Sequence, residues 1–285
     1  MEPVVPPHPL SYREQLRSFL REDWGTQDWS TAAVPDRPMR GRILAKSGLV
    51  LAGLPMAIEV FRMVDPNLDM RPRVRDGDWM SPGDLALEIE GSSRAILQAE
   101  RVALNLLQRL SGTATLARAF SDAVAGTRAR ILDTRKTTPG LKLLEKYAVR
   151  CGGAFNHRHT LGDGVLLKEN HLAAAGGIRP AVQRVRAGAA PSLLRVEVEV
   201  QTLDQLREAL DCPDVDGALL DHMDVETLRE SVVVREAMGS RAFLEASGNV
   251  TLERVRAIAE TGVDYISVGA LTHSAPAADL SLLMG

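Results

Sequence analysis

Cysteine, aromatic residues and unbalanced charge are all scarce in this sequence. Its 285 residues include 2 cysteines and 4% aromatic residues, and the formal net charge is −3 at pH 7. Two cysteines without metal-like spacing argue against a disulfide scaffold and are typical of a reducing compartment. A mildly acidic chain offers no general electrostatic basis for nucleic-acid binding.

Long apolar runs are absent as well. No segment has the run of about 20 apolar residues that a membrane-spanning helix requires, and residues 1–20 lack the apolar core of a signal peptide. We therefore expect a cytoplasmic protein that binds neither membranes nor nucleic acids. The composition, 45% hydrophobic and 25% charged, is that of a globular protein with one large domain or two ordinary ones.

Residues 8–110 combine helix and strand signals without a repeat. Ser11 and Glu14 have the spacing of a capping box, which predicts a helix over residues 12–22. Short apolar stretches separated by turn residues predict strands over residues 40–90. This part of the chain is expected to form a separate α+β domain.

A long helical pattern covers residues 94–125. Its apolar residues recur at helical spacing, which predicts a long helix. Ser111 and Gly112 interrupt the pattern, so we expect this helix to end there and a second helix to follow.

The pattern changes to an alternation of strands and helices after residue 128. The apolar runs that predict strands are 129–134, 152–157, 164–169, 193–200, 217–222, 242–247 and 264–270. Repeated strand–helix units indicate a parallel sheet. Because the chain lacks the glycine-rich loops of nucleotide-binding open sheets, a barrel is the favoured architecture.

Four cations follow these apolar runs, at positions where a buried strand would give way to a loop. They are Arg135, Lys136, Arg158 and Lys168, with His157 among them. The carboxyl ends of the strands carry the active site in a parallel barrel. Several cations from different strands at this edge predict a site for a polyanionic substrate.

Carboxylates are expected at the same edge. The period of two in the strand 193–200 puts Arg195, Glu197 and Glu199 on one face, which would point into the barrel. Burying these charges is costly unless they pair or hold a ligand. Asp221 ends the next strand and is a further candidate.

Small residues follow the last two strands. Ser247 and Gly248 come after one strand, and Gly269 and Ala270 come after the other. Small residues let an anion approach the backbone N–H groups, so these pairs are candidates for binding a phosphate.

Other interpretations of some polar residues remain open. Glu197 and Glu199 could form an ion-pair network with Arg195 that has only a structural role. His157 and His159 could suggest a metal site, but no third ligand has a useful spacing, and a hydrogen bond donated by His157 is favoured.

Three residues near this region are expected to have no catalytic role. Lys142 and Lys146 lie on a helical face that we expect to be solvated. Cys151 is expected to be a small core residue and not a nucleophile.

Eight stretches of the sequence resemble the quinolinate phosphoribosyltransferases, also called nicotinate-nucleotide pyrophosphorylases (carboxylating). They are ERVALNLLQRLSG (100–112), DTRKTTPGLKLLEKYAV (133–149), NHR (156–158), LLKENH (166–171), VEVEV (196–200), LLDHM (219–223), EASGNV (245–250) and ISVGALTHSAPAADLSL (266–282). They lie in order over most of residues 95–285, and REDWGTQDWST (21–31) matches more loosely. The departures from the family pattern are Ala154, His222 and Ala278, none of which removes a charged group.

The resemblance implies a fold and an assembly. It implies an N-terminal α+β sandwich domain over residues 1–115, followed over 116–285 by a TIM-like α/β barrel of six to seven parallel strands with a C-terminal helical segment. It also implies a homodimer, or a larger oligomer, in which the N-terminal domain of one subunit covers the barrel mouth of the other.

The resemblance further implies a reaction and roles for the residues. Quinolinate and phosphoribosyl pyrophosphate would give nicotinate mononucleotide, pyrophosphate and carbon dioxide in NAD biosynthesis, with Mg²⁺ as the cofactor. The residues expected to bind quinolinate are Arg101 from the partner subunit, Arg135, Lys136, His157, Arg158 and Lys168. Those expected to bind phosphoribosyl pyrophosphate are Lys136, Lys168, Glu197, Asp221, Ser247, Gly248, Gly269 and Ala270. Glu197 and Asp221 would hold the metal, and with Lys136 they would serve catalysis.

Two alternative functions are weighed against this one. A paralogue of the same fold could transfer phosphoribose to, or merely bind, a different small acid, and the family has a relative associated with molybdenum transport. The retention of all five cationic groups of the anion site argues against this alternative. A different class of protein, either a non-catalytic barrel or an aldolase-type lyase with Lys168 as a Schiff base, would need an apolar pocket around the lysine.

Overall fold

The computed structural model describes residues 4–189, 191 and 193–285, and these form two compact units. The N-terminal unit contains the described residues up to Arg118 together with 137–153 and 270–285. The barrel unit contains residues 119–136 and 154–269. The first division lies close to the boundary expected near residue 115. The N-terminal unit also takes in two later segments.

The N-terminal unit combines a mixed set of helices with a small antiparallel sheet. Its helices are η1 (Pro9–Ser11), α1 (Arg13–Trp24), α2 (Trp29–Ala32), α3 (Leu54–Val64), α4 (Ser93–Ala123), α5 (Lys142–Cys151) and α11 (Ala270–His273). Its strands are β1 (Pro38–Ala45), β2 (Leu49–Val50), β3 (Asp69–Pro72), β4 (Trp79–Met80), β5 (Leu85–Ser92) and β12 (Leu280–Met284). The helix expected over residues 12–22 is confirmed, but its N-cap is Tyr12 without a side-chain capping bond. The predicted capping box at Ser11 is therefore wrong.

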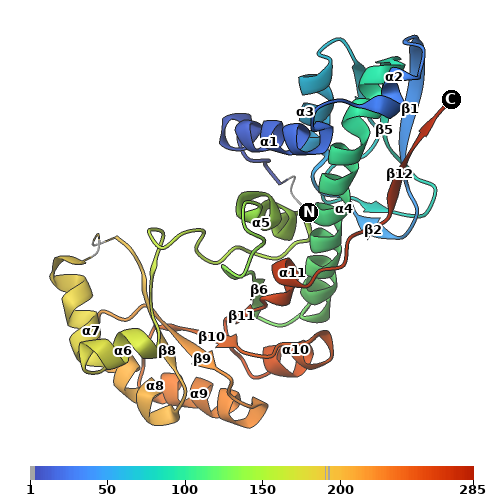
Figure 1. The fold of residues 1–285 in the computed structure, drawn as a ribbon. Coiled ribbons are helices and arrows are strands. Elements are labelled where there is room, and N and C mark those ends of the chain that lie inside the picture. Colours follow the sequence, from blue (N-terminus) through green and yellow to red (C-terminus); the bar gives the residue numbers. More distant parts are fainter. Residues whose placement is uncertain (1–3, 190, 192) are drawn as a thin grey trace. The chain divides into compact units, whose positions relative to one another are not determined.

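The sheet of this unit joins segments that are far apart in the sequence. Its strands lie in the order β12-β1-β5-β3, and β2 pairs with β4 in a second, two-stranded sheet. The C-terminal strand β12 pairs antiparallel with β1, from Ala45 opposite Leu280 to Gly41 opposite Met284 (Figure 1). Helices and the sheet enclose a core in which Phe61, Leu87 and Leu107 are fully buried.

Helix α4 is continuous over 31 residues, so the break predicted at Ser111-Gly112 is wrong. Both small residues serve packing. The Ser111 hydroxyl accepts a hydrogen bond from the Ala52 N–H at 3.0 Å. A Cβ at Gly112 would overlap the backbone of Pro276, so only glycine allows the C-terminal segment to cross the helix at this point.

The barrel unit is built from repeated strand–helix units. Its parallel strands are β6 (Arg130–Leu132), β7 (Val165–Leu167), β8 (Val196–Val200), β9 (Gly217–Asp221), β10 (Phe243–Ser247) and β11 (Tyr265–Ser267). Its helices are α6 (Glu169–Ala175), α7 (Ile178–Arg184), η2 (Val185–Ala189), α8 (Leu203–Leu210), α9 (Val225–Ala237) and α10 (Leu252–Ala259). The strands form one sheet in the order β6-β11-β10-β9-β8-β7, and the helices cover its outer face (Figure 1). This confirms the expected TIM-like α/β barrel.

Residues 152–157 do not form the expected strand. Only Phe155 joins the sheet, in a single parallel bridge to Leu132 of β6. Residues 154–158 nevertheless lie beside the edge strand β6 at Phe155, and we call these five residues the strap. Gly152 and Gly153 precede the strap and belong to the end of α5 and its turn, which shortens the segment available for a strand.

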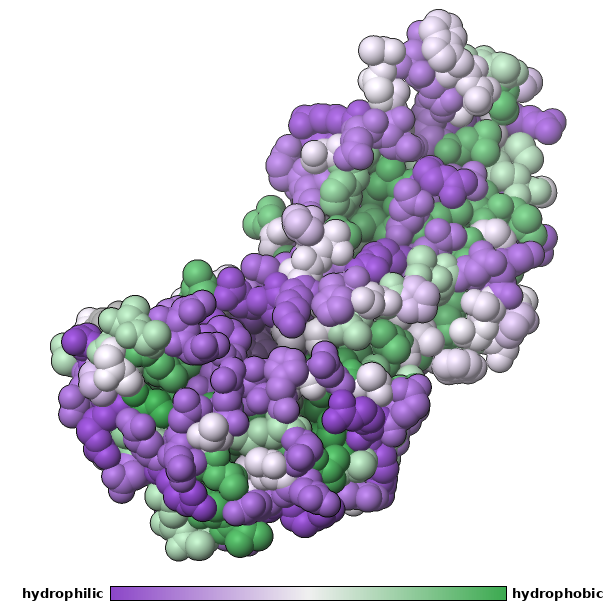
Figure 2. All heavy atoms as spheres, turned by 60° about the horizontal axis from the view of Figure 1, so that its bottom comes forward, coloured by the Kyte–Doolittle hydropathy of each residue, from purple (hydrophilic) through white to green (hydrophobic). Residues whose placement is uncertain are grey.

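Side chains alternate along the barrel strands as expected for a layered interior. In β8, Val196, Val198 and Val200 are buried in the outer layer. Thr202 and Asp224 cap α8 and α9 with side-chain hydrogen bonds, whereas Thr251 makes no capping bond at α10. On the face shown in Figure 2, hydrophilic residues cover most of the barrel unit, at the lower left.

None of the helices within the described ranges is long and apolar enough to span a membrane.

Candidate active site

The loop after β6 carries the first two predicted cations. Arg135 and Lys136 follow this strand within three and four residues of its end, and the Lys136 N–H donates a hydrogen bond to the Thr134 hydroxyl at 3.0 Å. This loop starts where the buried strand ends, as the sequence predicts. The two cations therefore lie at the carboxyl edge of the barrel sheet.

Arg158 lies near this loop. Its side chain is partly buried, and its guanidinium donates to the Gly164 carbonyl at 2.8 Å. Burial and then the positive charge of Arg135 lower the pKa of Arg158, so the two guanidinium groups are close enough to repel each other. Cations held together in this way form a favourable site for an anion.

Lys168 is the N-cap residue of α6, directly after β7. Its ammonium group forms an ion pair with Glu199 of β8. The alternative in which Glu199 pairs with Arg195 is therefore wrong, since the cation beside Glu199 is Lys168. This ion pair replaces the apolar lysine pocket that the Schiff-base lyase would need, which argues against that alternative.

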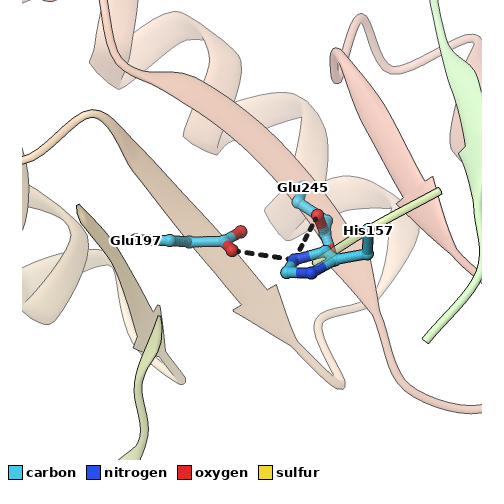
Figure 3. Close-up of side chains that lie close together, drawn as sticks. All are labelled: His157, Glu197 and Glu245. Atoms are coloured by element: carbon cyan, nitrogen blue, oxygen red, sulfur yellow. Dashed lines mark hydrogen bonds and ion pairs between the residues drawn. The ribbon is translucent and has the colours of Figure 1, made fainter. Parts of the chain in front are cut away.

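His157, Glu197 and Glu245 point toward one another inside the barrel (Figure 3). His157 Nε2 lies 3.0 Å from a carboxylate oxygen of Glu197 and 3.5 Å from one of Glu245. His157 Nδ1 accepts the Arg158 N–H at 2.8 Å, so the proton of the neutral ring is on Nε2. His157 thus donates to Glu197, and the hydrogen bond expected of this residue is confirmed.

Burial controls the ionisation of both carboxyl groups. Glu197 is 4% exposed and Glu245 is 1% exposed. Desolvation raises the pKa of Glu197 to about 7, although the charges of Arg158 and Lys168 oppose the change. Desolvation and the neighbouring Glu197 raise the pKa of Glu245 to about 8. At neutral pH the pair therefore holds a proton more readily than two ordinary carboxyl groups would.

The three groups are close enough to be considered as metal ligands. Their ligand atoms lie within 4.8 Å of one another, and buried oxygens of Glu197 and Glu245 have no hydrogen-bond partner within the described residues. The tautomer of His157 opposes this use. Coordination through Nε2 would move the ring proton to Nδ1, where it would face the Arg158 N–H.

Asp221 lies on a neighbouring strand but at a different level from Glu197. The strand register places Glu197 beside Gly217, at the start of β9, and Asp221 at its end beside Ser247. The Asp221 carboxylate lies 2.9 Å from His222 Nδ1. Both carboxylates provide the hard oxygen ligands that Mg²⁺ prefers.

The loop after β10 has the small residues expected for a phosphate site. Gly248 has φ +96°, and a Cβ there would overlap the His222 ring, so the position requires glycine. His222 and Asn249 also adopt left-handed conformations, with φ 57° and 48°. Strained backbone of this kind is concentrated at functional sites. Ser247 ends β10 beside Asp221.

Two predicted site residues belong to the N-terminal unit. Arg101 is exposed on α4, and Ala270 is the first residue of α11. Gly269, which precedes Ala270, is the last residue of the barrel unit. The roles expected for Arg101 and Ala270 stay predictions.

Glu245 belongs to the site, although the sequence does not point to it. The burial predicted for Lys146, which lies outside the site, is wrong. Glu245 lies in an apolar run two positions from Ser247, and this spacing alone could have placed it on the inward face of β10. Lys146, expected on a solvated face, is fully buried. Cys151 is buried, as expected, and desolvation raises the pKa of its thiol to about 12, which makes it unreactive at neutral pH.

Comparisons with known proteins match nearly the whole chain. Residues 28–111 match the family model of the quinolinate phosphoribosyl transferase N-terminal domain, and residues 113–283 match that of the C-terminal domain. A probable nicotinate-nucleotide pyrophosphorylase (carboxylating) from Synechocystis sp. is 42% identical over 94% of this chain and 90% of its own. The nicotinate-nucleotide pyrophosphorylase (carboxylating) of Mycobacterium leprae is 42% identical over 95% of this chain and 96% of its own.

Solved structures of the same family have the same fold as this chain. The nicotinate-nucleotide pyrophosphorylase from Francisella tularensis superposes with a TM-score of 0.94 at 37% identity, covering 100% of both chains. A second structure, from Streptococcus pyogenes, has a TM-score of 0.92 at 40% identity and covers 98% of this chain and 99% of the other.

Proposed function

The chain belongs to the quinolinate phosphoribosyltransferase family, and from this membership we propose that it transfers phosphoribose to quinolinate with loss of carbon dioxide. The reaction takes quinolinate and phosphoribosyl pyrophosphate to nicotinate mononucleotide, pyrophosphate and carbon dioxide. It is a pentosyl transfer that belongs to NAD biosynthesis. The single observation that carries it is the group of cations from separate loops at one edge of the barrel.

The cations suit the two carboxylates of quinolinate. Arg135 and Arg158 are close enough to repel each other, and an arginine can bind a carboxylate through two parallel hydrogen bonds. Lys136 and Lys168 add point charges from the loops that follow β6 and β7. His157 lies beside them with its ring held by Glu197. A dicarboxylate would relieve the repulsion that the ligand-free cluster carries.

Glu197 and Asp221 are proposed to act on phosphoribosyl pyrophosphate. As the ring nitrogen attacks C1 of the ribose, pyrophosphate leaves and positive charge develops on the sugar, which a carboxylate such as Glu197 would stabilise. Glu197 and Asp221 would hold Mg²⁺, which supplies charge neutralisation for the departing pyrophosphate. Because the two carboxylates lie at opposite ends of the β9 register, we assign them to different parts of the metal–substrate complex.

The 5′-phosphate is assigned to the loops after β10 and β11. Ser247, Gly248, Gly269 and Ala270 provide small side chains and backbone N–H groups there. Gly248 requires glycine for its left-handed conformation, and its backbone N–H is proposed as one of the donors to the phosphate.

Decarboxylation needs no further cofactor. Once ribosylated, the ring nitrogen is cationic, and it stabilises the electron pair that remains at C2 when carbon dioxide leaves. A proton then adds to C2. The substrate therefore supplies its own electron sink, and ribosyl transfer must come first.

We further propose a cytoplasmic homodimer, or a larger assembly built from it, with shared sites. Arg101 of one subunit would complete the quinolinate site of its partner. Its exposure on α4 supports this assignment, since a surface arginine is accessible to a second chain.

The assay that tests the function combines quinolinate, phosphoribosyl pyrophosphate and Mg²⁺ and detects nicotinate mononucleotide. When quinolinate is labelled in its C2 carboxylate, labelled carbon dioxide should be released only if phosphoribosyl pyrophosphate is present. Activity should stop with EDTA and return with excess Mg²⁺. Release of the label without phosphoribosyl pyrophosphate would contradict the proposed order, and turnover without metal would contradict the cofactor.

A further inference from the structure

The strap carries two residues of the anion site and joins the sheet through its Phe155 backbone. The Phe155 N–H donates to the Ile131 carbonyl at 2.8 Å, and the Asp133 N–H donates to the Phe155 carbonyl at 3.0 Å. The bridge to β6 holds this one residue of the strap. His157 and Arg158 therefore lie beyond the point where the strap pairs with the sheet.

Beyond the backbone hydrogen bonds of Phe155, the side chain of Asp133 holds the strap. One carboxylate oxygen accepts the His157 N–H at 2.9 Å, and the other accepts the Asn156 side-chain amide at 2.6 Å. Asp133 is fully buried. A buried carboxylate is stable only when donors surround it, and hydrogen bonds to a charged acceptor are strong and directional.

Asp133 also begins the loop that carries the other cations. It directly follows β6, and Arg135 and Lys136 come two and three residues later. One buried carboxylate thus connects the start of this loop to the strap. Any shift of the Asp133 side chain would change the spacing between Arg135 and Arg158.

We propose that Asp133 is a positioning residue that sets the separation of the cations binding the two carboxylates of quinolinate. The proposal rests on the proposed function. Asp133 does not touch the substrate, because its side chain is inaccessible, and it acts through His157 and Arg158.

The Asp133→Asn substitution keeps the size of the side chain but changes its hydrogen-bonding pattern. It therefore tests whether Asp133 positions the strap through its hydrogen bonds and not only by packing. Asp133 accepts at both oxygens, whereas asparagine has one acceptor and one donor. In Asp133→Asn, an amide NH₂ must face either the His157 N–H or the Asn156 amide. Combining it with Asn156→Asp restores the pairing, because the carboxylate introduced on the strap can accept from the amide introduced after β6. The carbonyl of that amide still accepts the His157 N–H.

The test measures steady-state kinetics for each substrate in the wild type, the two single variants and the double variant. Asp133→Asn should raise the KM for quinolinate at least about tenfold, the loss expected for one charge-assisted hydrogen bond. The KM for phosphoribosyl pyrophosphate should change less than about twofold, and the double variant should recover part of the quinolinate affinity. Asp211→Asn, which alters an exposed ion pair with Arg179 on the outer helices, is the matched control.

The outcomes separate this inference from the function itself. A wild-type enzyme that does not turn over quinolinate would refute the proposed function. A wild type that is active beside an Asp133→Asn variant with unchanged quinolinate KM would refute only the positioning role. Equal increases in both KM values, with no recovery in the double variant, would make Asp133 a purely structural residue. If Asp133→Asn does not fold, Asn156→Ala removes the hydrogen bond from the Asn156 amide to Asp133 and must still raise the quinolinate KM selectively.

Discussion

Arg135 and Arg158 of the anion site are held close together although their positive charges repel. Arg158 is partly buried, and its pKa is lowered by burial and by the charge of Arg135. Arg135 lies in the loop after β6, and Arg158 is anchored on the Gly164 carbonyl. The cost of holding these cations together is recovered when a dianion binds. Binding affinity should therefore depend strongly on each of them.

Replacement of Arg158 by alanine should weaken quinolinate binding by about 1.5–3 kcal/mol, the scale of a hydrogen bond to a charged group. Isothermal titration calorimetry on the folded variant measures the loss. Arg207→Ala, which removes an exposed arginine paired with Asp204 on α8, is the control and should leave the affinity unchanged. An Arg158→Ala variant that binds quinolinate as tightly as the wild type would rule out the clamp.

The buried Glu245 should make the stability of the ligand-free protein depend on pH. Its pKa is raised from 4.5 to about 8, so the folded state binds the proton more tightly than the unfolded state. Stability from this group is complete below pH 4.5 and is lost as the pH rises toward 8. Glu245→Gln mimics the protonated form, so its free energy of unfolding relative to the wild type should increase by roughly 1.4 kcal/mol per pH unit across this range.

Urea denaturation of both proteins at a series of pH values gives this difference directly. Glu260→Gln, which alters an exposed carboxylate on the outer surface, is the control. A difference that stays constant across the range in which Glu245 should titrate would show that this carboxyl group is ionised at no cost in the folded protein.

Some site residues can be identified from the sequence and others cannot, and the difference lies in how their charges stand relative to apolar runs. Arg135, Arg158 and Lys168 stand out because a charge that follows an apolar run is conspicuous. Glu245 is inconspicuous because its charge is isolated within an apolar run, and only the side-chain positions in the folded protein bring it close to His157 and Glu197. The sequence places Lys146 in solvent because helical spacing alone does not reveal which elements cover a helix face.

At the scale of elements, α4 shows how tertiary packing overrides a local signal. Glycine usually weakens a helix, so Ser111-Gly112 predicts a break. In the structure Gly112 is required by the segment that crosses the helix at Pro276, and Ser111 accepts a hydrogen bond from the Ala52 N–H. The strap shows the opposite case, since an apolar run that predicts a strand forms only one bridge. The alternation of strand and helix signals predicts the six other barrel strands, because each stands between helical segments in the sequence and packs its outer face under the helices.

Gly112→Ala should destabilise the protein although alanine is the better helix former. The gain in propensity is about 1 kcal/mol, whereas overlap with a backbone that cannot move aside costs about 1–3 kcal/mol or more. We expect a net loss in the free energy of unfolding, measured by urea denaturation. Asp122→Ala, at an exposed position of the same helix, should be close to neutral. A Gly112→Ala variant more stable than the wild type would mean that the C-terminal segment does not pack against this turn.

At the scale of the whole molecule, the proposed shared site predicts complementation between inactive subunits. Arg101→Ala and Lys136→Ala should each abolish most activity, since each removes a cation from every site. In a mixed dimer, one of the two sites contains both wild-type residues. Mixing equal amounts of the variants under conditions of subunit exchange should therefore restore up to about a quarter of the wild-type activity per total subunit, because half of the dimers are mixed and each has one intact site of two.

Native mass spectrometry on subunits of different mass establishes that exchange has occurred. An Arg101→Ala variant mixed with a second, independently prepared Arg101→Ala sample is the control and should stay inactive. Exchange without any recovery of activity would place Arg101 in the site of its own subunit or outside the site.

The pairing of β12 with β1 has a consequence for how the protein is made. β1 leaves the ribosome before the whole barrel unit, but its edge partner β12 follows more than 230 residues later. Throughout synthesis the edge of β1 that β12 will cover offers unpaired N–H and C=O groups, and Gly112 awaits the Pro276 segment. The barrel unit, whose strands all precede this segment, can close during translation, whereas the N-terminal unit cannot be completed until residues 276–284 have left the ribosome. The unit whose synthesis begins before that of the barrel is thus completed after it.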